Sequence, residues 1–192
     1  MDLLKLLSSK KPKVGQTIFI AVDGHGGSGK STLAKWLSEQ VNAQVIRTDD
    51  FASWDNPPNW WPLVIERVFL PIKNGAKTLS YSRSKWWKHH HPESAVDQPG
   101  TNMMILEGVG SSRKEFREYI SLSIFVDTPK ELCLQRGLEL DGATGKTKEE
   151  LNQMWEQWFA EEDEYMQRDQ PVSHADIVID GTKPFEEQIS VD

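Results

Sequence analysis

Five short hydrophobic runs recur along the chain, separated by longer stretches in which apolar residues fall at helical spacing. The runs are rich in Ile, Val, Leu and Met and mostly do not alternate with polar residues, which is typical of parallel strands covered on both faces. Helices are expected between them at 31–42, 130–140 and 148–167, and a short amphipathic helix at the start of the chain. This alternation predicts a three-layer α/β fold around a five-stranded, mostly parallel sheet. The five predicted strands are 17–22, 44–48, 102–107, 122–126 and 176–180.

Two segments break the rhythm of strands and helices. The stretch 53–101 has prolines near both ends and contains a helix candidate at 62–70, followed by a hairpin expected around the turn signal Asn74-Gly75. An insertion this long in a small α/β domain usually carries function, and we expect it to bind a substrate. The second break, 141–150, is polar and glycine-rich, and we expect it to act as a mobile lid.

Composition and charge narrow the class of protein. The chain has 192 residues, 38% of them hydrophobic and 27% charged, which fits one globular domain spanning 1–192. Its net charge of −7 argues against a broad nucleic-acid or anionic-membrane surface. With the single cysteine Cys133 and no apolar run long enough to cross a bilayer, the sequence predicts a cytoplasmic protein without disulfides. The oligomeric state stays open, and a homo-oligomer is compatible with the sequence.

The segment GHGGSGKS, Gly24 to Ser31, follows the first predicted strand and leads into a predicted helix. It matches the phosphate-binding pattern G-x-x-x-x-G-K-[ST] completely and in the required structural context. Glycines let consecutive main-chain N–H groups converge on phosphate oxygens, and the helix N-terminus favours negative charge there. Lys30 is expected to reach the β- and γ-phosphates, and Ser31 to bind Mg²⁺. The predicted nucleotide-binding residues are Gly24, Gly26, Gly27, Ser28, Gly29, Lys30, Ser31 and Thr32.

Acidic residues end two other predicted strands, at Asp49 and Asp50 and at Glu107. Ligands of open α/β sheets gather at the carboxyl ends of the strands, so these acids should face the same phosphates. We expect Glu107 to hold Mg²⁺ together with Ser31. Asp49 is the candidate that orients the attacking hydroxyl and takes its proton. Capping of a following turn is the alternative for either aspartate.

Aromatic and histidine residues give weaker signals. Four tryptophans of the insertion offer rings for stacking on a planar base or for packing: Trp60, Trp61, Trp86 and Trp87. Consecutive side chains at His89–His91 do not converge on one ion, although one of them could contact the acceptor. The acidic run 156–165 is interpreted as a solvated helix face, and Trp155 and Trp158 as core.

Four segments together resemble the uridine kinase family, part of a wider P-loop group with phosphoribulokinase and bacterial pantothenate kinase. They are AVDGHGGSGKSTLA, TDDF, MMILEGV and HADIVIDG. The resemblance implies that Asp49 is the catalytic acid-base group, that Glu107 is the strand-end glutamate and that an arginine-bearing lid follows the fourth strand. In this chain Arg136 is kept there, but Leu140 precedes Asp141 where the family has an arginine.

These observations predict an ATP- and Mg²⁺-dependent kinase that phosphorylates a hydroxyl of a small molecule. A nucleoside such as uridine or cytidine is the leading acceptor. A pantothenate-like or sugar-phosphate acceptor, or a non-catalytic ATP-binding regulatory protein, remain alternatives, and the lack of an N/T-K-x-D segment counts against a GTPase switch. The predicted catalytic residues are Lys30, Asp49, Glu107 and Arg136. The predicted acceptor-binding residues are Asp49, Phe51, Tyr81, Arg83 and Trp87.

Overall fold

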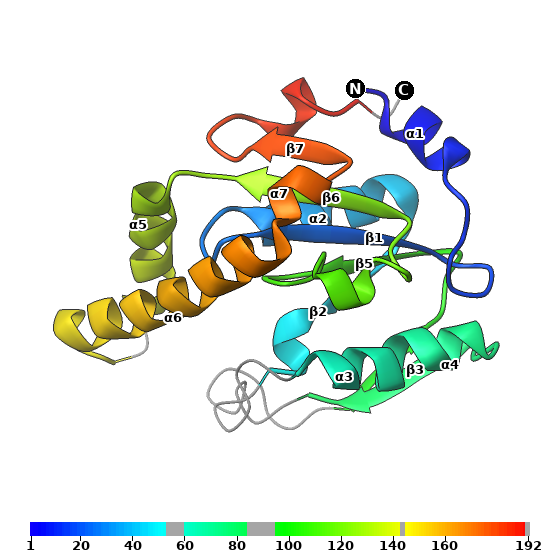
Figure 1. Cartoon of the computed structure of the whole chain (residues 1–192), viewed down its shortest axis with the longest axis horizontal. Coiled ribbons are helices and arrows are strands. Elements are labelled where there is room, and N and C mark those ends of the chain that lie inside the picture. Colours follow the sequence, from blue (N-terminus) through cyan, green and yellow to red (C-terminus); the bar gives the residue numbers. More distant parts are fainter. Residues whose placement is uncertain (53–59, 84–94, 143–144, 191–192) are drawn as a thin grey trace.

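A five-stranded parallel sheet forms the centre of the computed structural model, which describes residues 1–52, 60–83, 95–142 and 145–190 (Figure 1). The predicted α/β fold and all five predicted strands are confirmed, and every pairing within this sheet is parallel. Its strand order is β2 (Gln44–Arg47), β5 (Met103–Glu107), β1 (Ile18–Gly24), β6 (Leu122–Asp127) and β7 (Ile177–Asp180). β1 is therefore the central strand, and the segment that follows β1 begins in the middle of the row formed by the carboxyl ends of the strands.

Alternate residues of the central strand enter two separate hydrophobic cores. Phe19 and Ala21 of β1 pack into the core that also contains residues of the segment 51–81. Ile20 and Val22 pack into the other core, together with the helices near the N-terminus. Both sets are fully buried, which explains why the strand reads as a continuous apolar run. The predicted three-layer arrangement follows from this division.

The helices lie where the apolar spacing predicts them. α1 (Leu3–Ser9) buries Leu3 and Leu7 against the core, as expected for an amphipathic first helix. The other helices of the sheet domain are α2 (Lys30–Val41), α5 (Lys130–Asp141), α6 (Lys148–Asp169) and the short α7 (Pro171–His174). α5 and α6 lie together beside the edge at which the strands end (Figure 1). None of the described helices is both long and apolar enough to cross a membrane.

The insertion forms a helical stretch and a small second sheet. α3 (Trp61–Val64), a π-helical turn (Ile65–Phe69) and α4 (Leu70–Lys73) run on from one another, close to the predicted helix at 62–70. β3 (Thr78–Ser82) and β4 (Ala95–Pro99) then pair as an antiparallel ribbon.

The prediction of a hairpin turn at Asn74-Gly75 is wrong. The amide of Gly75 donates to the carbonyl of Ile72, and its φ of +88° ends the helix instead. The strand that pairs with β3 comes later in the chain, at 95–99. An Asn-Gly pair supplies the left-handed conformation that a helix end needs as readily as the one a hairpin needs, and only the preceding apolar helix distinguishes the two.

Candidate functional site

The glycine-rich loop leaves the end of β1 and becomes the first turn of α2 at Lys30. Gly24, Gly27 and Gly29 have φ values of +147°, +74° and +98°, which side-chain-bearing residues rarely adopt. A side chain at Gly27 would also clash, because its Cβ would lie 2.2 Å from the carbonyl oxygen of Cys133. The loop is therefore shaped by its glycines and pressed against the start of α5.

Lys30 and Ser31 occupy the first helical turn below this loop. The Lys30 side chain folds back over the loop, and its ammonium group donates to the His25 carbonyl at 3.2 Å. The Ser31 hydroxyl donates to Oε1 of Glu107 at 2.8 Å. The Lys30 ammonium group, the Ser31 hydroxyl and the Glu107 carboxylate thus lie at the carboxyl ends of the strands.

Strand register explains why Glu107 reaches this point. In the sheet it stands opposite Val22 of β1 and Arg47 of β2, at the last paired position of β5. Its carboxylate is buried, and the Arg47 guanidinium lies 4.0 Å from Oε2. Burial raises the pKa of Glu107 above its ordinary value, while Lys30 acts in the opposite direction. A hydroxyl and a carboxylate are the oxygen ligands that Mg²⁺ prefers, so this pair fits the predicted ion.

Asp49 follows β2 in a short 3-10 turn, Thr48–Asp50, and shares the electrostatic environment of the loop. Desolvation by the surrounding protein raises its pKa, although the residue keeps contact with solvent. The positive charges of Lys30 and Arg47 lower the pKa and Glu162 raises it. Asp49 also raises the pKa of Glu107, so the two acids lie close enough to interact.

Asp50 points away from solvent into a cluster with residues of β3 and the segment that follows it. Its carboxylate accepts from the Tyr81 hydroxyl at 3.1 Å and lies 3.0 Å from Nε of Arg83. The ring of Phe51 packs on that of Tyr81, with centroids 4.8 Å apart. Phe51 and Tyr81 are both buried in the core. Of the predicted acceptor-binding residues, the structure thus brings together Phe51, Tyr81 and Arg83 around Asp50, next to Asp49.

Arg136 lies at the other flank of the loop. Its guanidinium donates to the carbonyl of Ser28 at 3.4 Å and to that of Gly181, after β7, at 3.1 Å. These contacts tie α5 to the loop and to the end of the sheet. They engage main-chain oxygens, so a role of Arg136 at the transferred phosphoryl group stays a prediction.

Other predictions on the insertion have mixed outcomes. Trp60 is buried in the core, and the guanidinium of Arg113 lies 5.4 Å from the ring centroid of Trp60 and 5.5 Å from that of Trp61. Packing is therefore the right interpretation for Trp60. The predictions on Trp86, Trp87 and His89–His91 fall outside the described residues.

Asp23 is a central residue that the sequence reasoning missed. Its buried carboxylate accepts from the amides of Gly24, Gly110 and Ser112 at 2.8, 3.0 and 2.9 Å. The hydroxyls of Ser112 and Tyr165 add two further bonds at 2.7 and 2.6 Å. One carboxylate thus joins the start of the loop, the turn after β5 and α6. The available signal was an acid ending an otherwise apolar strand directly before the first loop glycine.

The interpretation of 156–165 as a solvated face is wrong for Glu162. This side chain is buried against the loop, where its carboxylate contacts His25 and the amide of Gly26. Trp155, Glu162 and Tyr165 lie at positions i, i+7 and i+10 of α6, which places them on one side of the helix. Trp155 is buried, as predicted, and Trp158 is half-buried beside it. The helical spacing from the buried Trp155 was the signal that could have identified Glu162.

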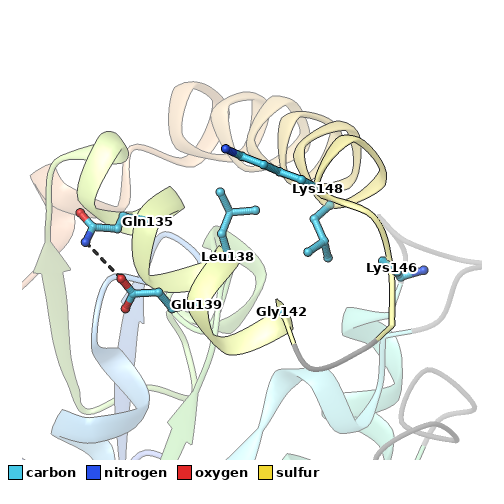
Figure 2. Close-up of a pocket in the computed structure, with 7 residues that line it drawn as sticks. Gln135, Leu138, Glu139, Gly142, Lys146 and Lys148 are labelled. Atoms are coloured by element: carbon cyan, nitrogen blue, oxygen red, sulfur yellow. Dashed lines mark hydrogen bonds between the residues drawn. The ribbon is translucent and has the colours of Figure 1, made fainter.

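A separate hollow of about 460 Å³ lies between the end of α5 and the start of α6 (Figure 2). α5 extends to Asp141 and α6 begins at Lys148, so both ends of the predicted lid at 141–150 are helical. The hollow is lined by Gln135, Leu138, Glu139, Gly142, Lys146, Lys148 and Leu151, none of which belongs to the loop or to the acidic site. The lid function of this segment remains a prediction.

The sequence of this chain is similar to those of known proteins. A family model described as Phosphoribulokinase / Uridine kinase family matches residues 61–184. A uridine kinase of Haemophilus ducreyi is 27% identical over 146 residues, covering 65% of this chain and 67% of the relative. A uridine kinase of Yersinia enterocolitica is 27% identical over 151 residues, covering 67% and 70%.

Solved structures show the same fold. A possible uridine kinase from Bacillus stearothermophilus superimposes with a TM-score of 0.63 at 21% identity, covering 93% of this chain and 95% of that one. A putative fructose transport system kinase from Silicibacter gives a TM-score of 0.58 at 15% identity, covering 84% and 89%. At these identities the likeness concerns the fold alone.

Proposed function

The chain belongs to the phosphoribulokinase / uridine kinase family, and we propose that it transfers the terminal phosphoryl group of ATP to a hydroxyl of a nucleoside such as uridine or cytidine. The observation that carries this proposal is that Lys30, Ser31 and Glu107 lie together at the carboxyl ends of β1 and β5, and that Asp49, after β2, interacts electrostatically with Lys30 and Glu107. A phosphate-binding loop alone also serves motors and switches. An additional acid beside the metal-binding pair is what transfer to a hydroxyl requires.

Each of these residues has a distinct task in the proposed reaction. The loop amides and Lys30 hold the phosphates of ATP and keep the terminal phosphorus in line with the acceptor. Ser31 and Glu107 would hold Mg²⁺, which neutralises charge on the phosphate oxygens when bound. Asp49 accepts the proton of the attacking hydroxyl. Its raised pKa brings the acid closer to the pKa range in which general bases work well, and the positive charges of Lys30 and Arg47 limit that rise.

The cluster around Asp50 supports an uncharged acceptor. Arg83 is a cation on this side of the site, but the buried carboxylate of Asp50 lies 3.0 Å away and balances its charge. An acceptor phosphate would have to compete with that carboxylate for the guanidinium. Sugars and bases instead offer hydroxyl and carbonyl groups, which bind near a neutralised ion pair without adding a charge. This favours a nucleoside over a sugar phosphate.

Release of ADP measured with a panel of acceptors tests the proposal. We expect uridine or cytidine to stimulate turnover strongly, and pantothenate and sugar phosphates to stimulate it little. The Asp49→Asn variant should lose this stimulation by a factor of about 10² or more and still bind MgATP. Asp176→Asn, the same substitution near the opposite edge of the sheet, is the matched control and should retain stimulation. Turnover that no acceptor changes would contradict the kinase function.

A further inference from the structure

The phosphate-binding loop is in contact with a carboxylate of its own protein. Oε2 of Glu162 lies 2.8 Å from Nδ1 of His25, and the amide of Gly26 donates to both carboxylate oxygens, at 3.1 and 3.2 Å. Main-chain N–H groups of such loops are the groups that bind phosphate oxygens. The negatively charged Glu162 side chain therefore already accepts from a main-chain N–H group that we expect to bind phosphate.

The contact is shaped by the residues around it. A Cβ on Gly26 would come within 3.1 Å of Oε1 of Glu162 and 2.9 Å of the Trp155 ring, so a glycine is needed for α6 to approach this closely. Three residues further along the helix, Tyr165 binds the carboxylate of Asp23 at the base of the loop. The backbone of α6 is thus anchored beside the loop independently of Glu162.

The position of Lys30 indicates which phosphate would meet this carboxylate. Its ammonium group, which we assign to the β- and γ-phosphates, donates to the carbonyl of His25, the residue before Gly26. The Gly26 amide belongs to the same peptide group as that carbonyl and points the opposite way, so Glu162 binds the loop beside the expected positions of the β- and γ-phosphates. The charge of Glu162 also raises the pKa of Asp49, the proposed acceptor of the proton, so the two acids interact electrostatically.

We propose that Glu162 is an internal competitor of the terminal phosphate of ATP. The inference rests on the proposed function, because it takes the loop as the ATP site. The terminal phosphate of ATP must displace the Glu162 carboxylate from Gly26, and the two negative groups then repel each other. ADP lacks this phosphate, so both the displacement and the repulsion are small for ADP. Since Tyr165 keeps α6 in place, the Glu162 side chain turns away and the helix itself stays. The contact between Glu162 and Gly26 lowers the affinity for ATP relative to ADP, and it keeps other anions from binding the Gly26 amide.

Titration calorimetry with MgATP and MgADP tests this on three proteins: wild type, Glu162→Gln and Glu161→Gln. Glu161 is the exposed neighbour on the same helix, so its variant removes an equal charge without touching the loop. We expect Glu162→Gln to bind MgATP about tenfold more tightly than wild type, since placing like charges together is costly. The gain for MgADP should be clearly smaller, and Glu161→Gln should match wild type. If Glu162→Gln does not fold, Glu162→Asp, whose shorter side chain withdraws the charge, should show the same order.

The outcomes separate the inference from the proposed function. Binding of MgATP by wild type together with equal or weaker binding by Glu162→Gln overturns the inference, because Glu162 would then support the loop rather than compete for it. An equal gain for MgATP and MgADP, or an equal gain in Glu161→Gln, overturns it as well, since the effect would be one of general charge. Absence of nucleotide binding in all three proteins overturns the proposed function and the inference together.

Discussion

The hydroxyl of Ser31 lies 2.8 Å from Oε1 of Glu107, although the two residues are 76 positions apart in the chain. The distance follows from the parallel pairing of β1 with β5, which places Glu107 beside Val22 at the start of the loop. Ser31 lies in α2 and Glu107 in β5, so the pair forms only when α2, β1 and β5 are all in place. It is the feature of the site that the proposed function assigns to Mg²⁺.

Removing one oxygen of this pair should weaken the use of Mg²⁺ before it affects nucleotide binding. We expect Ser31→Ala to raise the Mg²⁺ concentration for half-maximal activity about 10- to 100-fold, because the ion loses a protein ligand. Initial rates at fixed ATP over a range of Mg²⁺ measure the change. Ser38→Ala, at a half-buried position two turns further along α2, is the control and should behave as wild type. An unchanged Mg²⁺ requirement in Ser31→Ala would contradict the assignment.

Glu107 should reduce the stability of the folded protein at neutral pH. Burial raises its pKa in the folded state, so the charged form is less favourable there than in the unfolded chain. The resulting penalty is absent below the ordinary value of 4.5, grows as the pH rises above it, and is complete above the raised pKa. The uncharged Glu107→Gln retains an acceptor for Ser31.

Glu107→Gln is therefore expected to unfold at a higher temperature than wild type at pH 7 and at about the same temperature at pH 4. Its activity should fall by a factor of about 10² or more, since Mg²⁺ loses its carboxylate. Thermal unfolding at the two pH values, followed by circular dichroism, provides the measurement. A variant that is less stable than wild type at pH 7 would show that the Ser31 and Lys30 contacts outweigh burial.

The sequence predicts the site residues next to strand ends well and those contributed by α6 poorly, for a physical reason. Gly24, Lys30 and Glu107 sit at fixed distances from strand ends, and parallel pairing brings strand ends together whatever the side chains are. Glu162 instead depends on which face of α6 turns toward the loop, and the bonds to Asp23 depend on how the turn after β5 and α6 pack around the end of β1. Charged residues surround Glu162 on both sides in the sequence, so composition indicates solvent, and only the periodicity from Trp155 indicates burial.

Tyr81 offers a test of the acceptor side of the site. Its hydroxyl donates to Asp50, and Tyr81→Phe would leave a buried carboxylate oxygen with one partner fewer. We expect a loss of stability of about 1–2 kcal/mol and a rise in KM for the acceptor of severalfold, because Arg83 loses its fixed position. KM for ATP should stay within twofold, as the loop is not involved. Tyr119→Phe, whose ring packs in the same core on Phe69, controls for the loss of a hydroxyl. Equal changes in both KM values would place Tyr81 outside the acceptor site.

Asp23 should be the residue on which the shape of the loop depends most. Its carboxylate receives five hydrogen bonds from four residues, and all the donors point at one small group. Asn in its place brings an NH₂ group against main-chain donors that cannot turn away, so Asp23→Asn should cost about 3 kcal/mol of stability. Tyr165→Phe removes a single donor from the same carboxylate and should cost about 1 kcal/mol.

The two variants should also differ in nucleotide binding. Asp23→Asn displaces Gly24 and the turn at Gly110, so the loop amides lose their alignment and affinity for MgATP should fall at least tenfold. Tyr165→Phe leaves both turns bonded to Asp23 and loosens only α6, so its affinity should change less than threefold. Denaturant unfolding and calorimetry on the same preparations give both numbers. If Tyr165→Phe lost affinity as severely as Asp23→Asn, the contact of α6 with Asp23, rather than the main-chain bonds of the loop, would determine the geometry of the phosphate site.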